Sequence, residues 1–140
     1  MSKRTHVAFG LLLAALLFKV NLASFVPIVI LSSMLPDLDL LLRSLLLIKH
    51  RKTFHNVWSL DLVCASATRL VPDVFPFIAA GILSHFIMGS LTKTGVMRLY
   101  PFSKSKLSGP FRTGGIFDNF LFLASILGLG YVLTQDLIPL

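Results

Sequence analysis

Charged side chains are scarce in this sequence. They make up 14% of its 140 residues, whereas a soluble domain averages about a quarter. Hydrophobic residues make up 55%, and the mean hydropathy is +0.83. A chain with so little polar surface is poorly suited to water, so the composition indicates an integral membrane protein. Its length allows one domain, residues 1–140.

Cysteine is nearly absent as well. The single Cys64 excludes a disulfide within the chain, and its apolar surroundings are typical of a buried or lipid-facing residue. The basic start at Lys3 and Arg4 has the charge order of a secretion signal, but no small-x-small cleavage site follows the apolar run. We therefore expect the run to be a retained first helix.

Five apolar segments fill most of the chain. They show no alternation of apolar and polar residues and consist largely of good helix formers, which excludes strands. About 20 residues are needed to cross the hydrocarbon core, so the first and third segments are short. The pattern predicts an all-α, polytopic membrane bundle of about five transmembrane helices. The segments are His6–Val20, Phe25–Leu42, Val57–Val71, Phe75–Leu91 and Ile116–Thr134.

The basic residues predict how the chain is oriented. With the N-terminus in the cytoplasm, five crossings place eleven of the 13 Lys and Arg on the cytoplasmic side and leave only Lys19 and Arg69 outside. The C-terminus is then outside, and the inner membrane is the expected location. Because the net charge of +7 falls between apolar runs, it indicates membrane lipids rather than nucleic acid as partners. A homo-oligomer or a membrane-complex partner stays open.

This topology brings ionisable residues from the whole chain to a similar depth. Such residues are costly in a membrane and usually face a bundle interior or an aqueous cavity. Imidazole nitrogens and carboxylate oxygens together suit a divalent metal, with Zn²⁺ favoured by the His content and Mn²⁺ or Mg²⁺ by the paired Asp. The predicted metal ligands are His6, Asp37, Asp39, His55, His85 and Asp118.

Each candidate also has a simpler interpretation. Asp37 and Asp39 follow Pro36 and can mark a helix break, while their i,i+2 spacing puts them on different faces of a regular helix. A buried imidazole at His85 needs a partner, which a helix–helix hydrogen bond supplies as well as a metal does. Asp118 can simply be a helix N-terminal charge. The shared depth, rather than any single residue, favours a site.

Several short motifs carry a resemblance to a known family. They are Thr5-His6, Leu35-Pro36-Asp37-Leu38-Asp39, His50-Arg51 with His55, His85, Leu91-Thr92-x-x-Gly95, and Leu99-Tyr100-Pro101-Phe102. In order and spacing the chain is similar to membrane-bound proteins predicted to be metal-dependent hydrolases, a family with a LexA-regulated bacterial member. The resemblance implies a small helical inner-membrane protein with a His and Asp metal site, and hydrolysis of a phosphoester.

The sequence departs from that family at two places. The family's fourth helix usually reads His-x-x-x-Asp, but Gly89 stands four residues after His85. The family's Thr-His-Ser appears as Phe54-His55-Asn56. An i,i+4 pair shares one helix face, so the change removes a ligand or a base.

Two hypotheses follow. In the first, the protein is a metal-dependent hydrolase acting on a phosphoester or lipid-like substrate at the cytoplasmic face. Asp37 or Asp39 would then take a proton, and Arg51, Lys52 and Arg98 would hold substrate phosphate. In the second, it is a non-catalytic membrane subunit or scaffold with a vestigial polar cluster, which Gly89 favours.

Overall fold

The structure is a computed structural model that describes residues 1–18, 24–37, 56–97, 99–100 and 102–137. All regular elements in these residues are helices, as the sequence predicted. Helices are confirmed in the segments expected at His6–Val20, Val57–Val71, Phe75–Leu91 and Ile116–Thr134, with differences of a few residues at their ends. Lys19 and Val20 of the first segment lie outside the described residues. The elements are α1 (Lys3–Leu17), α2 (Val26–Met34), a 3₁₀ turn η2 (Leu35–Asp37), α4 (Val57–Leu70), α5 (Phe75–Ser90) and α6 (Ile116–Leu137).

Proline determines where the second segment begins and ends. Pro27 lies in the first turn of α2, where its missing N–H costs no hydrogen bond, and a proline opens α5 in the same way. The expected helix over Phe25–Leu42 is helical through its described residues from Val26 to Asp37, but it changes type at Leu35. Helix α2 gives way to η2 at Leu35, because Pro36 cannot donate to the helical ladder and its ring crowds the preceding turn. Residues 38–42 of that expected helix lie outside the described residues.

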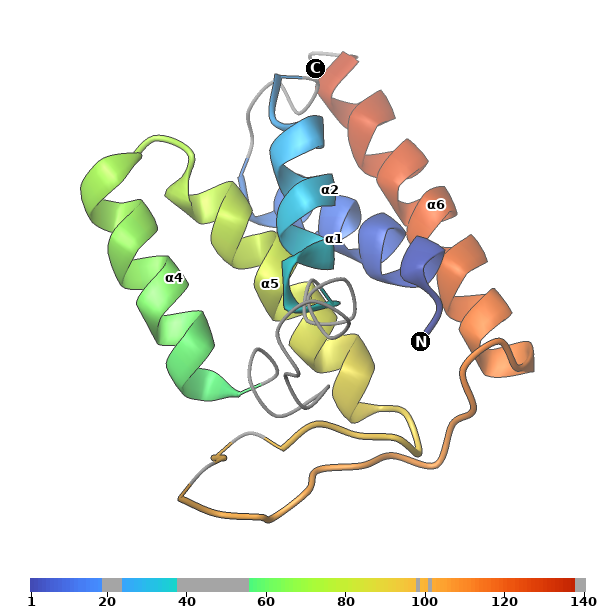
Figure 1. The fold of residues 1–140 in the computed structure, drawn as a ribbon. Coiled ribbons are helices and arrows are strands. Elements are labelled where there is room, and N and C mark those ends of the chain that lie inside the picture. Colours follow the sequence, from blue (N-terminus) through green and yellow to red (C-terminus); the bar gives the residue numbers. More distant parts are fainter. Residues whose placement is uncertain (19–23, 38–55, 98, 101, 138–140) are drawn as a thin grey trace.

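Helices α1 and α5 form the centre of the bundle. Helix α1 contacts α2, α5 and α6, while α5 contacts α1, α2 and α4 (Figure 1). Small residues allow this close packing. A Cβ on Gly81 of α5 would lie 2.0 Å from Ser32 Oγ of α2, and one on Gly10 of α1 would lie 2.9 Å from Ser84 Oγ of α5. Without a strong hydrophobic force between helices in lipid, such close van der Waals packing is a main source of association.

The connection between α5 and α6 crosses below the helices in Figure 1. It has two isolated bridges, Thr92 with Phe111 and Val96 with Leu107, but no continuous ladder in its described residues. The turn out of α5 is held by Thr92, whose Oγ1 donates to Gly89 O at 2.8 Å and accepts from Gly95 N at 3.3 Å. Gly95 has a φ of 58°, in the left-handed region that favours glycine.

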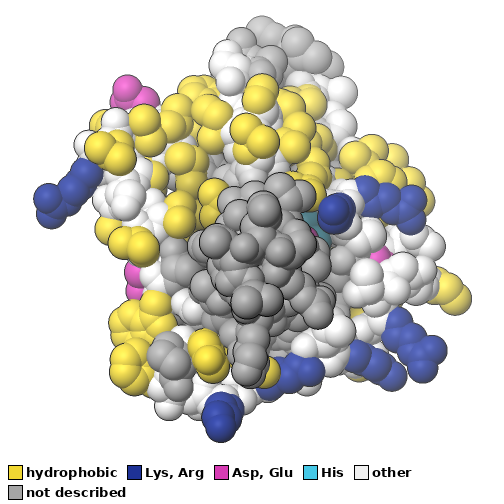
Figure 2. Space-filling view, in the orientation of Figure 1, with side chains coloured by type: hydrophobic (Ala, Val, Ile, Leu, Met, Phe, Trp, Pro, Cys, Tyr) yellow, Lys and Arg dark blue, Asp and Glu magenta, His cyan; other side chains and the backbone are white. Residues whose placement is uncertain are grey.

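Only one helix among the described residues is long and apolar enough to cross a membrane by itself, namely α6 over Ile116–Gln135. The apolar helices Val26–Asp37 and Phe75–Ser90 are shorter. Large exposed apolar side chains lie along α6, including Ile116, Phe120 and Leu127. Figure 2 shows apolar side chains over the upper part of the visible face and most Lys and Arg side chains along its lower and right-hand parts.

Candidate functional site

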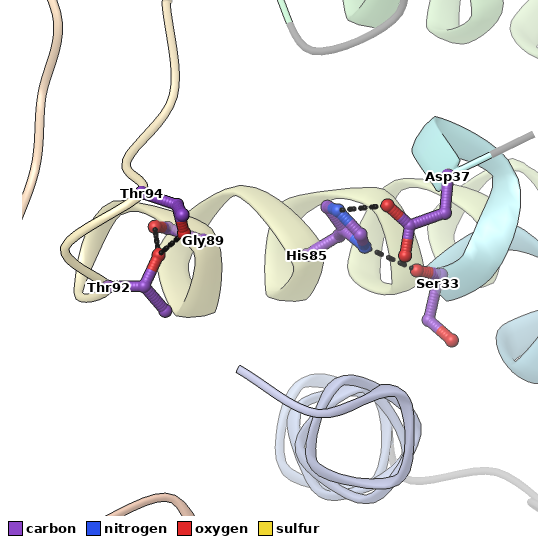
Figure 3. A network of polar contacts seen from close by, with 6 residues as sticks. All are labelled: Ser33, Asp37, His85, Gly89, Thr92 and Thr94. Atoms are coloured by element: carbon purple, nitrogen blue, oxygen red, sulfur yellow. Dashed lines mark hydrogen bonds and ion pairs between the residues drawn. The ribbon is translucent and has the colours of Figure 1, made fainter. Parts of the chain in front are cut away.

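His85 lies buried in the C-terminal half of α5, where it contacts two neighbouring segments. Its Nδ1 is 2.8 Å from the backbone carbonyl oxygen of Ser33 in α2, and its Nε2 is 3.8 Å from Asp37 Oδ1 in η2 (Figure 3). A carbonyl oxygen only accepts, so Nδ1 carries a hydrogen, and in the neutral ring Nε2 is left with its lone pair. The lone pair of Nε2 is then directed toward the Asp37 carboxylate. This is the tautomer that a metal-binding histidine adopts when a backbone carbonyl orients it.

His6 of α1 lies against the same imidazole. The two rings are stacked, with centroids 4.1 Å apart and an interplanar angle of 14°. His6 is 5% exposed, and within the described part of the chain its Nδ1 has no hydrogen-bond partner. A buried polar atom without a partner costs roughly 1–3 kcal/mol. Such an atom therefore needs an explanation, such as a bound water or ion.

A small cavity adjoins these groups. It has a volume of about 30 Å³, which exceeds the roughly 10–15 Å³ needed for a water molecule. His6, Asp37 and His85 line it, and so does Gly89. The remaining lining residues are Met1, Thr92 and Val96. The chain thus brings together three of the predicted ligands from α1, η2 and α5, together with the position where the resembling family carries Asp.

These residues fit a divalent ion in part. Zinc binds imidazole nitrogen and carboxylate oxygen at about 2.0–2.2 Å, so two donors 3.8 Å apart can share one ion. The unpartnered His6 Nδ1 is a further nitrogen beside the cavity. However, no three His, Cys, Asp or Glu side chains within the described ranges group as a complete metal site. The predicted ligands Asp39 and His55, and the predicted phosphate-binding Arg51, Lys52 and Arg98, lie outside the described residues.

Asp118 occupies a different position. It is 1% exposed at the start of α6 and is absent from the cavity lining. Its Oδ1 accepts from Thr5 Oγ1 at 2.5 Å and Ser2 Oγ at 3.3 Å. Its Oδ2 accepts from the backbone N–H groups of Ser2, at 2.8 Å, and Gly114, at 2.6 Å. The carboxylate joins the start of α1 to the start of α6, which is the structural role that a helix N-terminal charge suggested.

Sequence reasoning assigned no role to several residues around the cavity. Ser33 orients His85 through its main chain, so its side-chain identity carries no signal. Thr92 belongs to the Leu91-Thr92-x-x-Gly95 motif, and that motif was the available clue. Its threonine closes the turn that brings Val96 to the cavity wall. The motif therefore shapes the cavity rather than supplying a ligand.

Comparison with known proteins identifies the family. No curated protein and no solved structure matches the chain. The family model described as YdjM inner membrane protein matches residues 1–138, nearly the full length. That match agrees with the apolar composition, the long apolar helix α6 and the expected inner-membrane location. The chain belongs to the YdjM inner membrane protein family.

Proposed function

We propose that this protein is a polytopic inner-membrane hydrolase that depends on a divalent metal and cleaves a phosphoester or lipid-like substrate at the cytoplasmic face. The observation that carries the proposal is the cavity shared by His6, Asp37 and His85. These residues come from segments as far apart as 79 positions, and a buried polar cluster of this kind is costly unless it has a structural or chemical use.

Three of the proposed metal ligands line the cavity, namely His6, Asp37 and His85. Asp39 and His55, which lie outside the described residues, would complete the ligand set. A bound divalent ion supplies Lewis-acid activation of water and of a phosphoryl oxygen. Zn²⁺ suits the imidazoles, while Mn²⁺ or Mg²⁺ would suit a site dominated by the two Asp. Asp118 is not needed, because hydrogen bonds already engage both of its carboxylate oxygens.

The chain's own groups have separate tasks in the proposed reaction. The Ser33 carbonyl holds the His85 ring in one tautomer, so that Nε2 remains a donor of electrons rather than of a proton. Asp37 or Asp39 would accept the proton of the attacking water. Arg51, Lys52 and Arg98 would neutralise the substrate phosphate, as charge-assisted donors do elsewhere.

A second candidate is a non-catalytic membrane subunit or scaffold. Gly89 favours it, because this cavity-lining position has no side chain where the resembling family carries a carboxylate. The hydrogen bond from His85 Nδ1 to the Ser33 carbonyl also links α5 to α2, as interhelical polar contacts do in other membrane bundles. In that case the cluster would stabilise the bundle and bind no metal.

The metal content of the purified protein separates the two candidates. The wild-type protein and the variant His85→Asn are extracted in mild detergent and analysed for Zn, Mn and other metals. An Asn amide can replace the Nδ1 donor to Ser33 but has no atom in place of Nε2, so His85→Asn should keep the fold and lose the metal. The exposed Asp73→Asn is the matched control and should retain the metal.

Hydrolysis is measured on the same samples with an aryl phosphate monoester and a diester. If the proposal is right, the wild-type protein contains about one equivalent of metal and cleaves a phosphoester. A chelator should abolish this cleavage, and His85→Asn should lower it. Metal without cleavage of any phosphoester would refute the hydrolase and leave a metal-stabilised bundle. Equal trace metal in wild type and His85→Asn would support the scaffold.

A further inference from the structure

The loop between α5 and α6 is strongly one-sided in charge. Residues 91–115 contain five Lys and Arg and no Asp or Glu. Its described basic side chains are all exposed to the surroundings, and the Lys106 ammonium donates to the Lys93 carbonyl at 3.4 Å, which holds two basic positions together. A surface of this charge complements anions rather than other basic or neutral surfaces.

The same loop exposes large apolar side chains. Phe102 is 82% exposed and Leu99 is 50% exposed. The Phe102 ring meets Trp58 of α4 edge-on, with centroids 5.5 Å apart, and Trp58 is itself 51% exposed. Two contacting aromatic rings that remain this open are unusual at a surface in water. Trp is enriched where a membrane meets water, because its ring is apolar and its N–H is polar.

The loop also lies where the helices end. It follows the last residue of α5 and precedes Ile116, the first residue of α6, the helix that is long and apolar enough to cross a membrane. Trp58 is in the first turn of α4 and contacts Phe102 of the loop. Figure 1 shows this end of α4 on the same side of the bundle as the loop. With α6 across the bilayer, the loop is at the level of the headgroups. Apolar side chains at that depth can enter the interface while the lysines remain at the phosphates.

We propose that Trp58, Phe102, Lys104 and Lys106 form an interfacial surface that binds anionic phospholipids. The two aromatic rings insert below the headgroups, and the ammonium groups of the two lysines pair with lipid phosphates. The occupant is a lipid rather than a soluble anion, because the surface combines exposed apolar rings with the positive charge. This surface would be the lipid-facing side of the loop, separate from the cavity at His85, and it requires no metal.

The protein carries its own probe, since Trp58 is its only tryptophan. The full-length protein in mild detergent is titrated with phosphatidylglycerol or with phosphatidylcholine of the same acyl chains, and Trp58 fluorescence is recorded. We expect saturation at lower concentrations of phosphatidylglycerol. Each lysine near an anionic surface raises the affinity for that surface about fivefold. The double variant Lys104→Gln/Lys106→Gln should therefore raise the half-saturating concentration of phosphatidylglycerol roughly 25-fold. Arg69→Gln, at the far end of α4, is the control and should change nothing.

A second measurement tests the depth of the rings. In nanodiscs, lipids brominated near the top of the acyl chain should quench Trp58 more than lipids brominated near its end. Equal half-saturation by the two lipids, or an unchanged value in the double variant, would overturn the proposal. Displacement of phosphatidylglycerol by millimolar inorganic phosphate would overturn it too, in favour of a soluble-anion site. Far-UV circular dichroism verifies that the variants remain helical.

Discussion

Replacement of Asp118 provides a sharp test of the packing between α1 and α6. The two carboxylate oxygens have partners of different kinds. Oδ2 accepts from the backbone N–H groups of Ser2 and Gly114, which can only donate. Oδ1 meets the hydroxyl groups of Ser2 and Thr5, which can donate or accept. The effect of a substitution therefore depends on which oxygen position it preserves.

Asn is expected to satisfy this arrangement. Its carbonyl oxygen can take the place of Oδ2 and accept both N–H groups, while its NH₂ takes the place of Oδ1 and donates to the Thr5 hydroxyl. The loss is then mainly the negative charge at the start of α6, about 1 kcal/mol from the helix dipole and charge assistance. The free energy of unfolding should fall by that amount in Asp118→Asn.

Ala at position 118 has no side-chain acceptor for these hydrogen bonds. Asp118→Ala leaves two backbone N–H groups without their acceptor. It also removes the shortest hydrogen bond of the fully buried Thr5 hydroxyl, which keeps only its contacts with Ser2 Oγ and the backbone carbonyl of residue 118. Each unsatisfied buried group costs roughly 1–3 kcal/mol, and Ser2 and Gly114 are open enough for water to reach them, so we expect a total of about 3 kcal/mol.

The measurement is thermal unfolding in mild detergent, followed by circular dichroism, for wild type, Asp118→Asn and Asp118→Ala. The expected order of stability is wild type, then Asn, then Ala. The exposed Asp73→Ala should match wild type. Equal losses in Asn and Ala would refute the reasoning, because they would mean that the charge of Asp118, rather than its hydrogen bonds, stabilises the contact.

Three further predictions concern other parts of the chain. Gly81→Ala should lower the unfolding temperature markedly, because its Cβ would overlap α2. Gly130→Ala is the control: its Cβ would have no atom within 4 Å, so it should be neutral or slightly stabilising in the same measurement. In Gly89→Asp the new Cβ would lie 3.1 Å from Val96 Cγ1, so Val96 must shift by a few tenths of an ångström to admit the carboxylate beside the cavity. The variant should be less stable than wild type in chelator and gain more from added Zn²⁺. Equal melting with and without metal would argue against a metal at this cavity. Reporter fusions after Lys106 and after Leu140 should report opposite sides of the membrane, and the same compartment for both would refute five crossings.

Much of the fold could be predicted because helices in an apolar chain are determined locally. Continuous apolar runs without alternation exclude half-buried strands, and Pro27 and Pro76 mark helix starts because their missing N–H is harmless there. Pro36 also predicted a helix break, but it did not predict that α2 would end at Met34 and continue as a 3₁₀ turn. Whether a proline bends or ends a helix depends on what the neighbouring segments can pack against.

The candidate site was predicted only as a set of residues at one depth. His6, Asp37 and His85 do meet, because the ends of α1, η2 and α5 lie together. Asp118 was predicted to join them, but its carboxylate at the start of α6 is engaged by the start of α1. Depth along a helix follows from position in the sequence, whereas the direction of a side chain around the axis depends on which helices are neighbours.

The sequence by itself therefore determined that the protein is a helical membrane protein and where most of its helices lie. These properties depend on local composition and on the cost of burying charge in lipid. Only the tertiary structure decided that Ser33 orients His85 and that Gly89 faces the cavity. Both depend on the rotation and close approach of helices distant in sequence, which small residues such as Gly81 permit and which no local pattern encodes.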